Sequence, residues 1–514
     1  TLPLLEELSA YCDEFLVHAV DVEGKNGGIE TGLVRMLSDY DGIPVTYAGG
    51  VHSWDDIELL KKLGKGKIDM TTGHIMKNII LFAIPIIIGN VLQQLYTTVD
   101  ALVIGKYCGD TSLAAVGTSS QPVEVLLCVF LGIGTGVSIL ISQYTGARES
   151  GKVVSVCGTS ITFIYIIGIP IGILGWFAAP YILEFMKVPQ DVWNAALIYT
   201  RVVFLGTLGN LGYNMNAGIL RGLGDSKASL WFLVVSCVSN IVFDLLFVAG
   251  FGMDVAGAAL STSIAMFISW IVSIVYIRKK FPEIQFTFLP RRFSGTMMKD
   301  ILAIGLPVGL NNSLYSLGHV ALQTFNNSQG AIFMAGGAVA GRITGCSNIA
   351  ITGLSSAATT FSGQNYGAKK YSRIKEGHWR IPLCSGLITL SCGLFFIMIH
   401  KPIIRFFSSD EMVLMYASRH VVVMLLSQWF FAIFNCIISI VNGTGKVRYT
   451  TIVNILMLWA VRIPSAYIIN RYFDGTWVML CFPISFSFGM FAMIGYYLFS
   501  PAWKEVMRMA EKNS

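Results

Sequence analysis

About twelve long apolar runs dominate the sequence after residue 69. Each is roughly 20 residues long, which is the length that an α-helix needs to cross a bilayer. Because backbone polar groups in lipid must be satisfied within their own segment, such runs fold as helices. We expect spans near residues 79–102, 120–142, 157–182, 195–219, 229–251, 256–277, 300–324, 335–361, 381–400, 414–440, 450–470 and 476–499. The sequence therefore predicts an all-α membrane protein, preceded by a small α/β fragment.

The composition excludes a soluble globule, because 54% of the 514 residues are hydrophobic and only 13% are charged. Soluble domains carry about 25% charged residues. Lysines and arginines stand in short groups between the apolar runs, not on one face, so we expect no nucleic-acid partner. The ten cysteines form no metal-ligand spacing, and we expect neither a metal site nor a cofactor.

The basic residues favour alternate loops, and this asymmetry predicts the orientation. Lysine and arginine gather after the second, fourth and sixth runs of each half, including Arg278–Lys280 and the C-terminal tail. Those loops, and both ends of the membrane body, are expected in the cytoplasm. The pattern predicts a multi-pass protein surrounded by lipid.

An internal repeat divides the membrane body into two halves. Gln143-Tyr144-Thr145-Gly146-Ala147 resembles Gln364-Asn365-Tyr366-Gly367-Ala368, 221 positions later. Six spans per half place both halves in the same orientation, related by a pseudo-two-fold axis along the membrane normal, with a cavity between them. We predict a fragment over 1–69, an N-lobe over 70–280, a linker over 281–299 and a C-lobe over 300–514.

Carboxylates inside apolar runs are costly and mark functional sites. Asp100 lies in the first span and Asp244 in the fifth. The repeat places Val461 and Ser465 at the positions that correspond to Asn240 and Asp244, so the second half has no matching acids. Two neighbouring acids among amide and hydroxyl oxygens can hold a proton or a small hard cation. The alternative is that the acids only stabilise the fold.

Other polar side chains follow one another at helical spacing and are expected to line the cavity. These are Gln93, Tyr96, Asn210, Asn311, Tyr315 and His319. A lone histidine among amides, such as His319, is also common as a hydrogen-bonded packing residue. Gly132, Gly134 and Gly136 resemble a dinucleotide fingerprint, but they lie inside an apolar span with no preceding strand, which favours helix packing.

Residues 70–514 resemble the multidrug and toxic compound extrusion (MATE) transporters. The resemblance rests on Pro85 to Asp100, Gln143 to Ala147, Arg221 to Asp225, Asn240 to Asp244 and Gly257 to Thr262. The DinF-like prokaryotic branch implies a cation or proton site of Asp100, Asn214, Asn240, Asp244 and Thr262. The lack of acids in the seventh and tenth spans differs from the NorM-like branch.

That resemblance implies a transporter of a prokaryotic plasma membrane that is not an enzyme, and we expect it to act as a monomer. It implies export of bulky amphiphilic, often cationic, compounds by alternating access, in exchange for an inward proton or sodium ion. One charge crossing roughly 150 mV supplies about 3.5 kcal/mol, so no nucleotide is required. A flippase of the same superfamily for lipid-linked precursors or polysaccharides is the alternative; it would predict extra spans or a strongly cationic cavity.

Residues 1–69 resemble the late part of the histidine-biosynthesis isomerase HisA, a (β/α)8 barrel. The run Asp21 to Lys25 and the turn Ala48-Gly49-Gly50 carry the resemblance, which implies a remnant of a phosphate site at Gly49 and Gly50. We expect strands within 15–20 and 43–50 and a helix over 53–63. Because the strands with the catalytic acids are absent, we expect a truncated fragment joined at a gene boundary, and remnant isomerase activity is only the alternative.

Overall fold

The computed structural model describes residues 5, 8, 15–19, 30–38, 45–48, 68–186, 188–290 and 293–512, without the side chains of residues 18, 35, 38, 46, 48, 110, 111, 113, 114, 118–126, 191 and 512. It divides into two compact units, Thr1–Asn78 and Ile79–Ser514. Each unit is described by itself.

The first unit contains a parallel strand pair. Strand β1 (Phe15–His18) pairs with β2 (Val45–Ala48), so that Phe15 faces Val45 and His18 faces Ala48. Helix α2 (Thr31–Ser38), which the sequence analysis did not anticipate, lies between the strands in sequence. The two predicted strands are confirmed. The expected helix over 53–63 and the turn at Gly49 and Gly50 lie outside the described residues.

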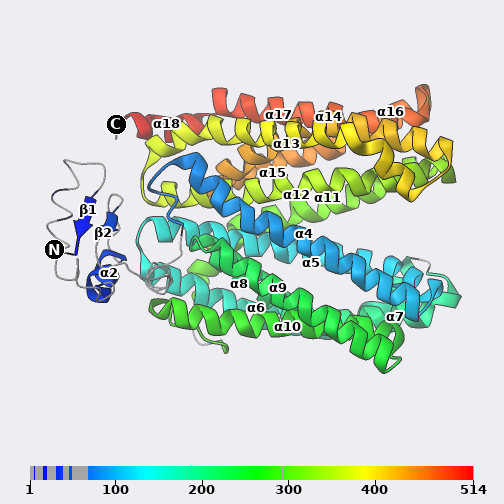
Figure 1. Cartoon of the computed structure of the whole chain (residues 1–514), viewed down its shortest axis with the longest axis horizontal. Coiled ribbons are helices and arrows are strands. Elements are labelled where there is room, and N and C mark those ends of the chain that lie inside the picture. The colour runs from blue at the N-terminus through cyan, green and yellow to red at the C-terminus, as the bar shows by residue number, and fades with distance from the viewer. Residues whose placement is uncertain are drawn as a thin grey trace. The chain divides into compact units, whose positions relative to one another are not determined.

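Long helices build the membrane body, and Figure 1 shows α4 to α10 on one side and α11 to α18 on the other. The N-lobe, residues 70–280, contains α4 (Ile75–Tyr107), α5 (Asp110–Gly146), α6 (Ser150–Phe185), α7 (Gln190–Leu205), α8 (Thr207–Gly222), α9 (Ser226–Asp244), the π-helical η1 (Leu245–Gly250) and α10 (Asp254–Lys280). The short η2 (Pro282–Ile284) follows.

The C-lobe, residues 300–514, repeats the pattern. Its elements are α11 (Gly295–Asn327), which begins just before it, α12 (Ala331–Gly367), α13 (Tyr371–Phe407), α14 (Glu411–Gly443), α15 (Val447–Ile455), the π-helical η3 (Leu456–Arg462), α16 (Ile463–Tyr472), the 3-10 turn η4 (Gly475–Leu480), α17 (Cys481–Phe499) and the terminal α18 (Pro501–Lys512). Every predicted span falls within one of these helices or a continuous series of them, except that 229–251 extends one residue past η1, and the helical prediction is confirmed.

Not all of these segments are equally apolar. Within the described ranges, nine helices are long and apolar enough to cross a membrane, and α7 with α8 makes a tenth that bends by 48°. Helices α11 and α12 have comparable lengths of 33 and 37 residues but more polar sequences. The bend falls at Gly206, where a Cβ atom would overlap the side chain of Ser263. The missing side chain lets α7 and α8 approach α10 closely.

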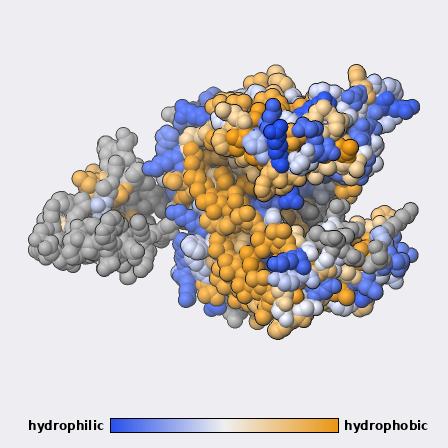
Figure 2. Space-filling model, turned by 45° about the vertical axis from the view of Figure 1, so that its right-hand side comes forward, coloured by the Kyte–Doolittle hydropathy of each residue, from blue (hydrophilic) through white to orange (hydrophobic). Residues whose placement is uncertain are grey.

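Large apolar side chains cover the outside of the body. Phe185, Met398 and Phe406 are 89%, 83% and 86% exposed. Figure 2 shows hydrophobic residues in a broad band over one face, with hydrophilic residues toward its ends. Soluble proteins rarely expose apolar patches of this size, so the band is the lipid-facing surface.

Glycines bring the two lobes into close contact. A Cβ on Gly132 of α5 would overlap the backbone of Gly309 in α11, and one on Gly136 would meet Gly305. Gly353 of α12 lies equally close to Ile87 of α4. The glycine-rich part of α5 is therefore a helix-packing surface, as the sequence predicts, and not a nucleotide-binding loop.

The repeated motifs at Gln143 and Gln364 join the two lobes at one end through a pair of hydrogen bonds, which we call the glutamine clamp. The Gln143 side chain donates to the carbonyl oxygen of Gly443 (2.8 Å), and that of Gln364 donates to the carbonyl oxygen of Gly222 (3.2 Å). The two acceptor residues, Gly222 and Gly443, are 221 positions apart, as the two glutamines are. Gly146 and Gly367 each lie against the carbonyl oxygen of the other lobe's glutamine, where any side chain would collide.

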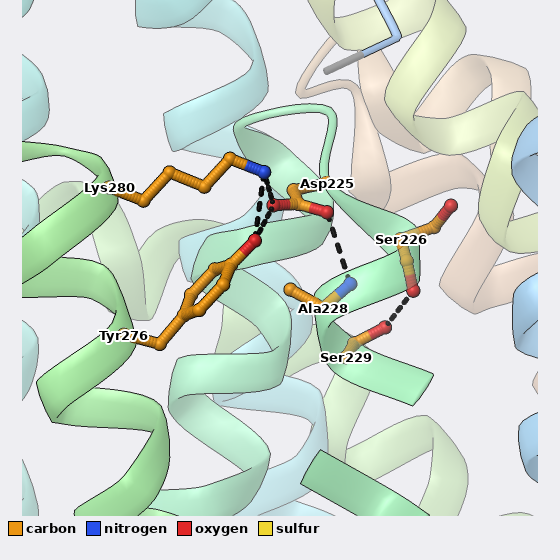
Figure 3. Close-up of polar contacts among 6 residues, drawn as sticks. All are labelled: Asp225, Ser226, Ala228, Ser229, Tyr276 and Lys280. Atoms are coloured by element: carbon orange, nitrogen blue, oxygen red, sulfur yellow. Dashed lines mark hydrogen bonds and ion pairs between the residues drawn. The ribbon is translucent and has the colours of Figure 1, made fainter. Parts of the chain in front are cut away.

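A polar cluster fixes the turn between α8 and α9 (Figure 3). Asp225 accepts a hydrogen bond from the Ala228 amide at 3.0 Å and thereby caps α9. Its second oxygen accepts from Tyr276 (2.8 Å) and pairs with Lys280 (2.7 Å), both on α10. Asp225 is almost fully buried. Asp225, the acid in the motif Arg221 to Asp225, thus connects the start of α9 to the end of α10.

Candidate ion and substrate sites

The two predicted acids lie next to each other in the N-lobe. Asp100 is in the second half of α4, and Asp244 is the last residue of α9 before η1 begins. Their carboxyl groups lie close enough to affect each other's charge, and Asp244 is fully buried. A π-helical segment often marks a functional position because it widens the helix at one residue. Here it starts directly after Asp244.

The oxygens around these acids lack donors. Asp100 Oδ1, both carboxyl oxygens of Asp244 and Asn240 Oδ1 are buried without a hydrogen-bond partner. Buried acceptors without a donor are rare and costly in folded proteins. Three of these oxygens belong to the neighbouring acids, and the fourth lies one turn before Asp244 on α9. Such a group of acceptors is a candidate site for a proton or a cation.

Helices α9 and α10 hold the site through side chains at one-turn intervals. The Asn240 amide donates to the Thr262 hydroxyl at 3.2 Å, and one turn earlier the Ser236 hydroxyl contacts the sulfur of Met266 at 3.6 Å. Ser261 lies beside Asp244 at the other end. The Asn240 nitrogen is used by Thr262, while its oxygen is buried without a hydrogen-bond partner, one turn before Asp244 on α9. Asn240 and Thr262 are thus brought together as predicted.

The acid pair is enclosed by two different walls. On one side, the residues that follow the acids in α4 and in η1 belong to an apolar cluster. This cluster consists of Val103, Ile104, Val248 and Ala258. On the other side, Tyr96 and Tyr199 lie within electrostatic range of Asp100. The sequence analysis missed Tyr199, because a tyrosine in an apolar helix carries no distinctive signal.

Both tyrosines line a cavity of about 440 Å³ in the N-lobe. The predicted cavity residues Gln93 and Asn210 line it, and so do Asn214 and Thr262 from the predicted ion site. The Asn214 amide donates to the backbone and side-chain oxygens of Asn210, both at 2.9 Å. Asn214 therefore faces the cavity, and among the described residues its side-chain amide donates along α8 and not to the acids.

A second cavity of about 920 Å³ lies against the C-lobe. The predicted residues Asn311, Tyr315 and His319 line it from successive turns of α11. The rings of Tyr315 and His319 meet edge to face, with centroids 4.8 Å apart. Cys128 of α5 lines both cavities, so the two chambers adjoin each other between the lobes.

Arg462 lies behind the C-lobe cavity, and the sequence analysis did not single it out. This residue ends η3 in the middle of a membrane span and is fully buried. Its Nε donates to the Ser485 hydroxyl at 2.9 Å, and Nη1 donates to the Tyr315 hydroxyl at 3.3 Å. Adding the repeat offset of 221 to Asn240 gives Val461, which precedes Arg462 by one residue. A comparison of the two halves position by position therefore passed over the charged Arg462.

No transition-metal site accompanies these chambers: across the described part of the chain, no three His, Cys, Asp or Glu side chains converge on a point that could hold such an ion. The acid pair with amide and hydroxyl oxygens instead suits a proton or a hard cation such as sodium.

Comparison with known proteins decides the family. The MatE family matches residues 85–246 and matches again over 307–468, once in each lobe. The chain belongs to the MatE family. Members of this family are membrane transporters, so the chain is a transporter and not an enzyme. A histidine-biosynthesis family matches residues 3–77, which supports the resemblance of the first segment.

Curated relatives of this MatE chain cover most of its length. It is 28% identical to the probable multidrug resistance protein YoeA of Bacillus subtilis, with 85% of this chain and 96% of the relative aligned. It is 26% identical to the probable multidrug resistance protein NorM of Thermotoga maritima, over 80% and 90% of the two chains.

Solved structures share the fold. A MOP superfamily transporter from Pyrococcus furiosus superposes with a TM-score of 0.77 at 24% identity, over 87% of this chain and 99% of the other. An outward-facing multidrug resistance MATE transporter superposes with a TM-score of 0.75 over the same shares at 24% identity. The helical MATE fold predicted from the sequence is confirmed.

Proposed function

We propose that this MatE transporter exports small amphiphilic compounds from the cytoplasm and that the acid pair of the N-lobe couples export to inward movement of a proton or sodium ion. The curated relatives named as multidrug resistance proteins support the first part. The four buried acceptor oxygens without donors at Asp100, Asn240 and Asp244 are the observation that carries the second.

The acid pair suits coupling because its charge must be balanced. Two adjacent carboxylates in a low-dielectric interior repel each other, and neutralising one of them removes most of that cost. A proton would convert one carboxyl into a donor for the other, and a sodium ion would take both acids and the Asn240 oxygen as ligands. Either ion changes the interactions between α4 and α9.

Helix α4 is the element that this change would move. Pro85 lies inside α4 and removes one backbone hydrogen bond from it, which makes a bend at that turn inexpensive. Asn90, one turn later, donates to Thr352 of α12 at 3.0 Å and so connects α4 to the C-lobe. Ion uptake at Asp100 would thus rearrange α4 relative to both chambers and release the cargo.

The glutamine clamp supplies the second half of the cycle. It joins α5 and α8 of the N-lobe to α12 and α14 of the C-lobe at the end of the bundle where basic loops predict the cytoplasm. For cargo to enter from that side, Gln143 and Gln364 must separate from Gly443 and Gly222. We propose that binding of cargo in exchange for the ion favours this opening.

Dye efflux from vesicles under an imposed pH or sodium gradient tests the proposal. Asp100→Asn and Asp244→Asn should each abolish gradient-driven efflux while the protein stays in the membrane. Asp410→Asn is the matched control, because Asp410 is an exposed cap of α14 and asparagine also caps helices. Full efflux by both site variants would exclude the acids as the coupling site.

A further inference from the structure

The buried guanidinium of Arg462 has no acidic partner. A charged arginine near the bilayer centre is costly even on the lowest insertion scales, and such residues usually pair with an opposite charge or with backbone carbonyls. In the described ranges, no carboxylate lies within ion-pair distance of Arg462. Its Nη2 atom is buried and donates to nothing. The C-lobe thus holds one uncompensated positive charge.

Aromatic rings surround this charge. The guanidinium lies over the rings of Phe482 and Phe486, at 4.9 Å from each centroid, and 5.5 Å from that of Tyr315. Cation–π contacts offset part of the desolvation cost but leave the net charge intact. Because the rings exclude water, the field of Arg462 remains strong over a short distance.

Tyr315 connects this charge to the cavity. Its hydroxyl accepts a hydrogen bond from Arg462 and lines the C-lobe chamber. A hydroxyl that accepts from a cation becomes a stronger donor through its own proton. The neighbouring wall offers amide groups, including Asn311, Asn435 and Asn454, and the residues that line the chamber include no acid.

We propose that the C-lobe chamber binds a single oxyanion, a carboxylate or phosphate, carried by the transported amphiphile. Tyr315 donates directly to the anion, and Arg462 supplies the positive charge behind it. The apolar part of the amphiphile lies against Phe431, which lines the chamber and packs on Phe486 with centroids 4.6 Å apart. The inference deepens the proposed export function and rests on it for the cargo, whereas anion binding can be measured without transport.

Binding to the purified full chain in lipid nanodiscs tests the inference. The probes are a fluorescent xanthene dye with a free carboxylate and the methyl ester of the same dye, read by fluorescence anisotropy. Arg462→Gln should weaken binding of the acid at least tenfold and change binding of the ester less than twofold. Tyr315→Phe should weaken only the acid, by about fivefold. Arg462→Lys should restore part of the preference.

A second probe separates a lipid phosphate from a dye carboxylate as the source of the oxyanion. A single-chain lysophosphatidic acid should displace the acid dye from the wild type and lose at least tenfold in potency against Arg462→Gln. Equal affinity of wild type and Arg462→Gln for the acid dye and the lysolipid, with unfolding temperatures that match, would overturn the proposal. If vesicles show no efflux but the acid preference persists, the export proposal fails and the anion site stands.

Discussion

The two lobes share a backbone plan but bury opposite charges. In the fifth span of the N-lobe, helix α9 ends at the buried Asp244, which lies near Asp100 of α4. The corresponding span of the C-lobe contains the buried Arg462. Where the lobes meet, however, Gln143 and Gln364 make equivalent contacts. The contacts that join the lobes are therefore the same in both halves of the repeat. The buried side chains that we assign to ion and cargo binding differ between the halves.

The largest expected difference in efflux is between substitutions at two positions that the repeat relates, Asp244 and Ser465. Asp244→Asn should lower the initial rate of gradient-driven dye efflux more than tenfold, because it removes a carboxylate from the acid pair. Ser465→Ala, at the corresponding position of the C-lobe, should change the rate less than twofold. The Ser465 hydroxyl only donates to the Val461 carbonyl of its own helix (2.6 Å). Similar losses in the two variants would remove the distinction between the lobes.

The next effect should be the same in both lobes. Gly146→Val and Gly367→Val each place a side chain against the carbonyl oxygen of the opposite glutamine, so the lobes cannot close at that end. We expect efflux to fall about tenfold in each variant and the distance between spin labels on α5 and α12 to increase. A strong loss in one variant alone would show that the clamp is not symmetric.

Removing the clamp's hydrogen bonds should have a smaller and again equal effect. Gln143→Ala and Gln364→Ala each remove one side-chain hydrogen bond, worth about 1 kcal/mol, or roughly a fivefold shift between closed and open states. The spin-label distance distribution measures that shift. Unchanged distributions in both variants would mean that the glycine contacts alone hold this end closed.

The smallest effect on transport is expected at the turn between α8 and α9. Asp225→Asn preserves a cap on α9 but loses the ion pair with Lys280, which should cost about 2 kcal/mol of stability. Lys446, at the corresponding position of the C-lobe, only donates to the Ala502 carbonyl, so Lys446→Met should cost less. Thermal unfolding in detergent measures both, and efflux by the surviving protein should be unchanged.

Much of the fold follows from the sequence because its signals are long. Every apolar run corresponds to a helix or a helix series, and the repeat of Gln143 and Gln364 indicates which ends meet. The acids at Asp100 and Asp244 stand out because carboxylates are rare in apolar runs. Their neighbour Asn240 follows from helical spacing.

Other features depend on packing that no single run encodes. The bend at Gly206 arises where α7 and α8 approach Ser263 of α10, a distant segment. Tyr199 joins the site only because folding brings its side chain on α7 within electrostatic range of Asp100 and Asp244. Arg462 was detectable as a charge within an apolar run, but its isolation from acids became evident only with the neighbouring helices in place. The lobe boundaries, the monomeric state and the choice between proton and sodium stay predictions.

Ion release on cargo binding tests the central claim most directly. A saturating amphiphilic dye is added to purified protein in weakly buffered solution, and released protons or sodium ions are measured with selective electrodes. We predict release from the wild type and from Asp410→Asn, and none from Asp100→Asn although the dye still binds. Undiminished release from Asp100→Asn would contradict the assignment of the N-lobe acids as the exchange site.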